Sequence, residues 1–122
     1  MEKRKLHGAE RLRVYGRALE FAEYVDRLLR SQYCDRSLAD QLLRAADSIV
    51  LNIAEGAAHY QAGKKLNHYR SAHGSAAECR AALTLLHRRH PRIFVEPGLR
   101  KTDMISMMLM ALIHAQENRR SN

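Results

Sequence analysis

Three side chains whose functional groups could take part in chemistry lie about one helical turn apart in the segment SIVLNIAEG, residues 48–56. Ser48, Asn52 and Glu55 offer a hydroxyl, an amide and a carboxylate, groups that serve in metal binding, acid–base catalysis or hydrogen-bonded packing. They belong to a series that advances by seven, four, three and four residues: Gln41, Ser48, Asn52, Glu55 and His59. At about 100° per residue this series forms one polar stripe along a helix. A second stripe follows in a later segment: Asn67, Ser71, Gly74 and Glu78, with Ser75 between it and the apolar face.

A di-metal carboxylate bundle is the first interpretation of these stripes. Such a site needs Glu-x-x-His on two helices and further inward-facing glutamates on the others. Glu55 instead has His59 four residues on, and Glu78 is followed by no histidine within that spacing. The segment His87-Arg88-Arg89-His90 supplies only half of a zinc site, with no cysteine nearby. We therefore expect no metal and no other cofactor.

Two further interpretations concern the same polar residues. Glu55 and Glu78 could act as a general acid and base, but no nucleophile, glycine-rich phosphate loop or oxyanion arrangement accompanies them. Alternatively, the polar residues form a seam that fixes the register of packed helices by hydrogen bonding. We favour this structural polar seam, which comprises Ser48, Asn52, Glu55, Ser75 and Glu78. We accordingly expect that the protein is not an enzyme.

Four amphipathic helices must position these residues. Apolar periodicity and breakers predict helices over residues 12–31, 37–56, 64–88 and 97–118. The third has the most regular heptad pattern, and the fourth is expected to pack through Met104, Ile105, Met108, Leu112 and Ala115. No segment combines period-two alternation with β-branched residues and turn signals. The sequence therefore predicts an all-α single domain over residues 1–122, an up-down-up-down antiparallel four-helix bundle.

The second helix is apolar over more of its surface than one bundle requires. Leu43, Val50, Ala54 and Ala57 form a second apolar strip beside the main one, and Leu51 lies off both. We therefore expect this surface to pack against another copy of the chain, which gives a homo-oligomer.

The charge points to an anionic partner. The chain has 21 Lys and Arg, 13 Asp and Glu and a formal net charge of +8. The excess is concentrated in residues 1–13, 59–70 and 87–101, which favours neutralisation of nucleic-acid phosphates. The expected phosphate-binding residues are Lys64, Lys65, Arg70, Arg88, Arg89 and Arg92. Because aromatic residues make up only 6% of the chain, we expect little base stacking and weak sequence preference. The alternative is a solvated basic surface that only keeps the protein soluble.

Targeting features are not evident in the sequence. No run reaches the roughly 18 apolar residues of a membrane span, and the charged N-terminus lacks the apolar segment of a signal peptide. Cys34 and Cys79 show no disulfide pattern. We therefore expect a cytoplasmic protein without a membrane partner.

Two motifs carry a family resemblance. The string Arg44-Ala45-Ala46, Ser48-Ile49 and Asn52-Ile53-Ala54-Glu55-Gly56 is followed by Gly74-Ser75 and then Glu78. The pair resembles the four-helix bundle family of 23S rRNA intervening-sequence proteins, which includes accessory proteins of diversity-generating retroelements. The segment Ala62-Gly63-Lys64-Lys65-Leu66 departs from that family's basic, hydroxyl-rich entry to the third helix.

The resemblance implies a homo-oligomer, typically a homopentamer, with a basic surface and no known catalytic activity. The retroelement branch implies binding to nucleic acid and to a reverse transcriptase. Our leading hypothesis is a non-enzymatic oligomer that binds RNA or DNA through phosphate contacts. The alternative is a protein-interaction scaffold, such as an accessory subunit of a retroelement reverse transcriptase.

Overall fold

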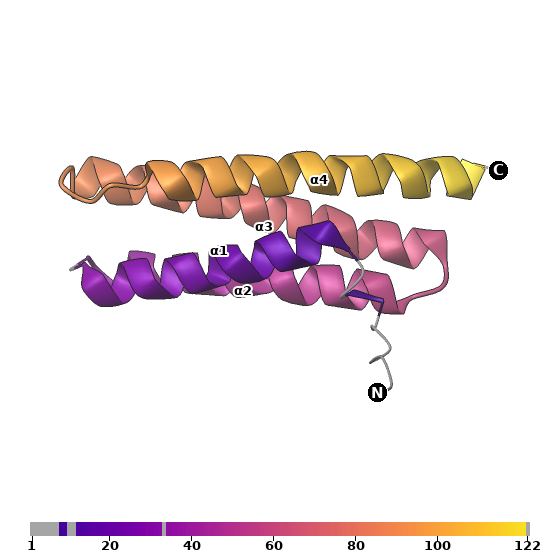
Figure 1. Ribbon diagram of the computed structural model, residues 1–122, viewed down its shortest axis with the longest axis horizontal. Helices are drawn as coiled ribbons and strands as arrows, with labels where there is room; N and C mark the ends of the chain where they lie inside the picture. Colours follow the sequence, from indigo (N-terminus) through magenta and orange to yellow (C-terminus); the bar gives the residue numbers. More distant parts are fainter. Residues whose placement is uncertain (1–7, 10–11, 33, 122) are drawn as a thin grey trace, which may run out of the picture.

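The computed structural model describes residues 8–9, 12–32 and 34–121, and its secondary structure there is entirely helical. The four helices are α1 (Arg13–Ser31), α2 (Arg36–Ala58), α3 (Ala62–Arg89) and α4 (Glu96–Ser121) (Figure 1). Each begins within two residues of its predicted start, and the largest difference is at the end of α4, which continues to Ser121 rather than residue 118.

The helices form a bundle in which sequence neighbours are also spatial neighbours. α1 packs on α2, α2 on α3 and α3 on α4, and α4 closes the ring against α1. The α2–α3 link and the C-terminus lie at one end in Figure 1, and the α1–α2 and α3–α4 links lie at the other. None of the described helices is long and apolar enough to cross a bilayer.

A continuous apolar core joins all four helices. Its largest fully buried side chains include Phe21 of α1, Leu42 and Ile49 of α2, Leu83 of α3 and Leu109 of α4. A smaller cluster of Leu66, Tyr69 and Ile113 fills the space between α3 and α4. Burial of side chains of this size stabilises a fold by roughly 1.5–3 kcal/mol each, so this core is the main reason that the helices associate.

The inward face of α4 differs from the predicted one. Ile105 is buried and Met108 and Leu112 are half-buried, but Met104 and Ala115 are exposed. The buried positions of α4 are Gly98, Thr102, Ile105, Leu109, Ile113 and Gln116. The prediction for Met104 and Ala115 was wrong because α4 is rotated so that two polar residues face inward, where the Thr102 hydroxyl donates to the Leu99 carbonyl over 2.8 Å.

Two glycines allow helices to approach closely. A Cβ at Gly56 would lie 2.5 Å from Cε1 of Tyr69, and one at Gly98 would lie 2.6 Å from Cε1 of Tyr24. Gly56 therefore sets the distance between α2 and α3, and Gly98 the distance between α1 and the start of α4.

The second apolar strip of α2 is partly used within the chain. Leu43 and Val50 pack against the common core, and Ala54 and Ala57 are half-buried. Leu51 remains 61% exposed, beside Leu19 and Ala22 of α1 in a shallow apolar hollow. The apolar surface of α2 that stays exposed is thus narrower than expected and is centred on Leu51.

Candidate functional site

A hydrogen-bonded seam links α2 to α3. The hydroxyls of Ser48 and Ser75 lie 2.8 Å apart. The Asn52 amide donates to the Ser48 carbonyl over 2.9 Å and to the Ser48 hydroxyl over 3.0 Å. Each such bond contributes about 0.5–1.5 kcal/mol net, and their partners are fixed. The seam therefore specifies which turns of the two helices meet.

His68 extends the seam and was not among the residues predicted for it. Its Nδ1 lies 3.2 Å from Oδ1 of Asn52 and 3.2 Å from Oε2 of Glu55, while its ring stacks on that of His59 with centroids 5.1 Å apart. Because both neighbours of Nδ1 are acceptors, the ring nitrogen must carry a proton there. The result is a relay of polar contacts from Ser75 through Ser48, Asn52 and His68 to the largely exposed Glu55.

Glu78 does not belong to this seam, which corrects the prediction. Glu78 is exposed, and no described side chain forms a hydrogen bond or ion pair with it. The seam side of α3 carries His68 and Ser75, seven residues apart and nearly aligned on a helix. Glu78 is rotated by about 60° from that line. The seven-residue spacing of His68 and Ser75 was the sequence signal for this side of α3. The predicted polar stripe, which included Asn67 and Gly74, lies one residue earlier in the sequence.

The described residues contain no cluster of three or more His, Cys, Asp or Glu side chains that could hold a metal ion. Burial raises the pKa of the Cys79 thiol to about 12, with a smaller effect from Glu78. A thiol with so high a pKa is protonated at neutral pH and is a poor nucleophile.

The first three predicted phosphate-binding residues lie near the start of α3. Lys64 is exposed. Lys65 instead donates to the carbonyls of Gly56 and Ala57 over 3.1 and 3.3 Å, at the end of α2. Arg70 pairs with Glu117 over 3.4 Å. Burial, with a smaller effect of the positive charge of Arg119, lowers the pKa of Lys65. Lys65 therefore caps a helix and is less available to a phosphate than the exposed Lys64.

The other three lie at the opposite end of α3. Arg88 and Arg92 are exposed, whereas Arg89 pairs with Asp35 over 3.1 Å. Asp35 also accepts from the Leu38 amide over 2.9 Å at the start of α2, so Arg89 supports a helix cap. Lys64 and Arg88 are 24 residues apart on α3, which corresponds to about 36 Å at 1.5 Å per residue. The six residues thus form two groups rather than one patch.

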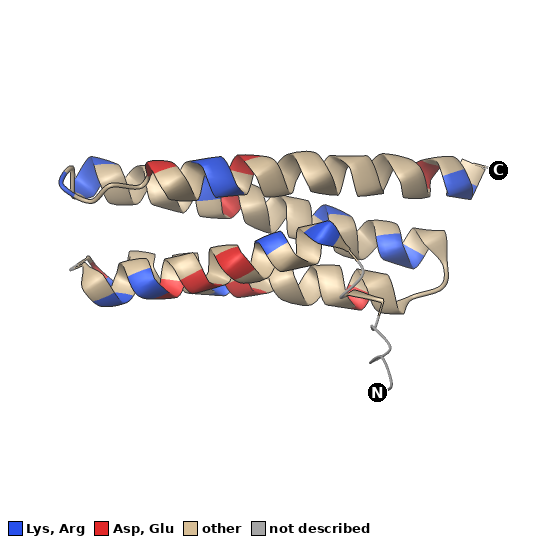
Figure 2. Cartoon of the chain, in the orientation of Figure 1, with Lys and Arg blue, Asp and Glu red and all other residues tan. Residues whose placement is uncertain are grey.

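Figure 2 shows how the charges are distributed: Lys and Arg lie at both ends of the bundle and also along α1 and within α4, where acidic residues are interspersed with them. Most of the basic N-terminal segment, residues 1–7, 10 and 11, lies outside the described residues. Arg119 and Arg120 are exposed at the end of α4, and the Arg120 guanidinium carbon is 3.7 Å from where a Cβ of Gly63 would lie. These arginines join the group that contains Lys64.

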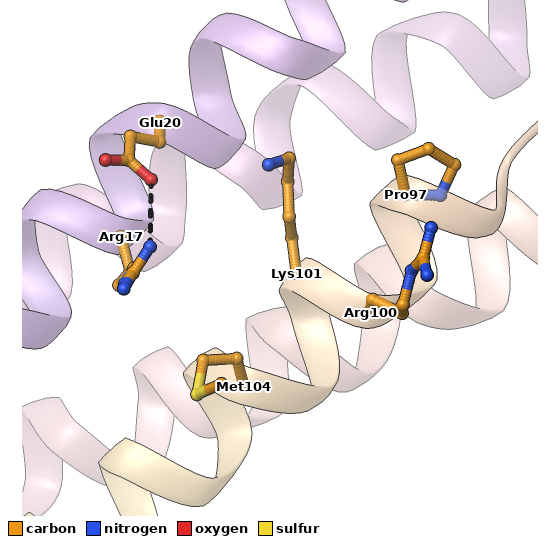
Figure 3. Close-up of a pocket in the computed structure, with 6 residues that line it drawn as sticks. All are labelled: Arg17, Glu20, Pro97, Arg100, Lys101 and Met104. Carbon is orange, nitrogen blue, oxygen red and sulfur yellow. Dashed lines mark hydrogen bonds and ion pairs between the residues drawn. The ribbon is translucent and has the colours of Figure 1, made fainter.

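A basic cleft between α1 and α4 was not predicted. Its volume is about 280 Å³, and Figure 3 shows its lining residues: Arg17, Glu20, Pro97, Arg100, Lys101 and Met104. Arg17 pairs with Glu20 over 3.5 Å, and Nζ of Lys101 lies 6.0 Å from the centre of the Tyr24 ring. Arg100 and Lys101 belong to the basic segment recognised in the sequence, but only the fold brings Arg17 beside them.

Two aromatic side chains are unexpectedly exposed, one in each of two links. Tyr60, between α2 and α3, is fully exposed at 100%, and Phe94, between α3 and α4, is 69% exposed. Both lie close in sequence to a basic group, Tyr60 to Lys64 and Phe94 to Arg92.

Comparison with known proteins places this arrangement in a family. No curated protein matches the chain. A crystal structure at 1.70 Å resolution of a protein of unknown function from the S23 ribosomal protein family of Bacteroides thetaiotaomicron VPI-5482 is similar, with a TM-score of 0.72 and 25% sequence identity. The similarity covers 82% of this chain and 97% of that one. Residues 10–93, more than half of the chain, match the family described as 23S rRNA-intervening sequence protein. The resemblance carried by the α2 and α3 motifs is therefore confirmed, and the chain belongs to the 23S rRNA-intervening sequence protein family.

Proposed function

We propose that this chain is a non-enzymatic, cytoplasmic protein that binds nucleic acid through phosphate contacts as a homo-oligomer. Each subunit would be an up-down-up-down antiparallel bundle, and a homopentamer is the assembly that the family resemblance suggests. The observation that carries the proposal is the exposure of Lys64, Arg88 and Arg92 at the ends of the bundle, where none of the described side chains forms an ion pair with them.

Unpaired cations at the surface favour a polyanionic partner. A Lys or Arg that replaces a condensed counterion on a phosphate gains the entropy of the released ion. An arginine already held by a carboxylate, such as Arg89 by Asp35, must first give up that contact. Lys64, Arg88 and Arg92 are therefore the most available of the six predicted residues, and Arg119 and Arg120 add to the Lys64 group.

Oligomerisation would strengthen such binding. Each subunit presents few free cations, and several copies would bring their basic ends to one nucleic acid, so that later contacts become intramolecular. The apolar hollow around Leu51 and the exposed Met104 and Met107 of α4 favour contacts between copies. Light scattering at micromolar concentration tests the assembly, and a monomeric mass would contradict it.

Fluorescence anisotropy with a labelled structured RNA tests the binding itself. Wild-type affinity should fall steeply with salt, by close to one power of concentration for each phosphate contacted. The triple charge reversal of Lys64, Arg88 and Arg92 to glutamate should abolish binding at low salt. Arg44→Glu is a single-site control for charge reversal, because Arg44 is exposed on α2 outside both groups. Equal loss in the control, or no loss in the triple variant, would contradict the proposal.

The exposed apolar residues favour a second candidate, a scaffold for a protein partner such as a retroelement reverse transcriptase. Leu51 and Met107 could bind an apolar partner surface, and the basic ends an acidic one. A pull-down with and without nuclease separates the two functions: a complex that persists after nuclease treatment favours the scaffold, and one that is lost favours nucleic-acid binding.

A further inference from the structure

The α3–α4 link holds Phe94 outward in a defined position. Its two neighbours, Ile93 and Val95, are only 3% and 4% exposed, so the chain passes through the link with alternate residues facing in and out. The Ile93 amide donates to the His90 carbonyl over 2.9 Å, and Nδ1 of His87 donates to the Ile93 carbonyl over 2.9 Å. The exposure of Phe94 therefore follows from an anchored backbone and not from a loose loop.

Arginines that form no ion pair with a described side chain lie close to Phe94 in sequence. Arg88 at the end of α3 and Arg92 in the link are both exposed, while Arg89 is held by Asp35. Asp35, which holds Arg89, and Glu96 at the start of α4 are acidic residues of this region, and Arg88, Arg89 and Arg92 outnumber them. The link and the adjoining end of α3 thus carry the two features that single-stranded nucleic-acid sites combine, an aromatic stacking surface and cations for phosphate contacts.

We infer that the α3–α4 link is a platform for single-stranded nucleic acid, on which Phe94 stacks on an unpaired base while Arg88 and Arg92 contact the adjoining phosphates. This inference rests on the proposed nucleic-acid binding and specifies its form at this end of the bundle. The phenyl ring has no hydrogen-bonding group, so it accepts any base. Bases in a duplex are already stacked on each other, so a duplex reaches the same surface only through its phosphates.

Tyr60 at the other end lacks comparable support. It is fully exposed, but buried residues do not flank it as they flank Phe94, since His59 is half-buried and Gln61 is exposed. The platform is therefore assigned to Phe94 alone, and the low aromatic content of the chain does not exclude stacking at one well-placed ring.

Anisotropy with two labelled probes of equal length, an oligouridine and an RNA duplex, tests the inference on the full chain. Phe94→Ala should weaken oligouridine binding by about tenfold, as expected for the loss of one stacked base. Duplex affinity and the salt dependence for both probes should stay within twofold of wild type. Phe94→Tyr should retain oligouridine binding. Leu85→Ala removes an exposed apolar side chain of α3 outside the link and should bind both probes normally.

The outcomes separate this inference from the proposed function. If wild type binds neither probe, the proposed function fails and the platform with it. If wild type binds both and Phe94→Ala binds oligouridine equally well, or loses both probes equally, only the platform is refuted. If Phe94→Ala changes the mass by light scattering without changing oligouridine affinity, Phe94 belongs to a protein contact and the platform is also refuted.

Discussion

Replacement of glycine by alanine should change the stability of this bundle differently at two positions, Gly56 and Gly74. Gly56 is buried where α2 crosses α3, and a Cβ there would lie 2.5 Å from Cε1 and 2.8 Å from Cδ1 of Tyr69. At Gly74, in the middle of α3, a Cβ would meet no atom within 4 Å. Neither glycine has a positive φ, so alanine is compatible with the backbone at both positions.

Helix propensity and steric overlap together determine whether alanine raises or lowers the free energy of unfolding at each position. Alanine is about 1 kcal/mol better than glycine inside a helix, and this gain applies fully to Gly74→Ala. At Gly56 the new methyl group overlaps the ring of Tyr69 by about 1 Å, since carbon atoms pack at about 3.5–4.0 Å. Tyr69 is buried, so relief requires a shift of the core, which costs about 1–3 kcal/mol. We expect Gly56→Ala to destabilise the fold by up to about 2 kcal/mol and Gly74→Ala to stabilise it by about 1 kcal/mol.

Thermal unfolding followed by circular dichroism, at one fixed protein concentration, measures both changes. For a chain of this size 1 kcal/mol corresponds to about 4 °C in Tm, so the Tm values of the two variants should differ by about 4–12 °C. In a Tyr69→Leu background the cost of Gly56→Ala should shrink, because the obstructing ring is gone. An equal rise in Tm for both alanine variants would refute the close approach of α2 and α3. A fall for Gly74→Ala would show that another surface packs there in solution.

Three further predictions concern caps, cations and thiols. The Leu38 amide, and to a smaller degree Arg89, holds the pKa of Asp35 below its ordinary value of 3.8. The stabilising effect is thus present above that value and lost as pH falls through the lowered pKa, so Asp35→Ala should lower Tm at pH 7 and approach the wild-type Tm once the pH is below the lowered pKa. Lys64→Ala should weaken RNA binding with little change in Tm. Lys65→Ala should cost about 0.3–1 kcal/mol of stability, as expected for a cation at a helix C-terminus, and weaken binding less; the reverse order in anisotropy would contradict the cap. A thiol reagent at pH 8 should label Cys34 in the folded protein and reach Cys79 only on unfolding, because burial holds the pKa of Cys79 at about 12; equal labelling would contradict that burial.

Apolar spacing predicted the helices closely but not every inward face. The α3 residues Tyr69, Ala72, Ala76, Cys79, Leu83 and Leu86 are all buried as their heptad spacing suggests. In α4 the methionines blur the pattern, because Met104, Met107 and Met110 make most of the circumference apolar. Thr102 and Gln116, which face the core, gave no hydrophobic signal. A rotation of less than one residue then decides which methionines are exposed, and side-chain packing alone determines it.

The seam shows that a polar stripe on one helix does not predict which residues of the neighbouring helix it contacts. Ser48 and Asn52 could be selected from their spacing, but their partners depend on how α3 is rotated against α2. Gly56 fixes that rotation by accepting the ring of Tyr69, which brings the neighbouring His68 to Asn52 and directs Glu78 to solvent. The sequence also does not show which basic side chains have partners within the fold. Lys65 and Arg89 were expected to contact phosphates, and the structure shows that they support the end and the start of α2.

The distance between the two basic groups determines the shortest duplex that can contact both of them on one subunit. Lys64 and Arg88 are about 36 Å apart along α3, and a DNA duplex rises about 3.4 Å per base pair, so about 11 base pairs of DNA lying along the bundle span both groups. Shorter duplexes can contact only one group of a subunit. Binding at fixed salt should therefore strengthen near this length in wild type, and the step should vanish when Arg88 and Arg92 are changed to glutamate. Arg44→Glu, which alters neither group, should keep the step. A smooth increase through this length in wild type would mean that the two ends of α3 do not act on the same duplex, and that phosphate contacts are made by one end of the bundle alone.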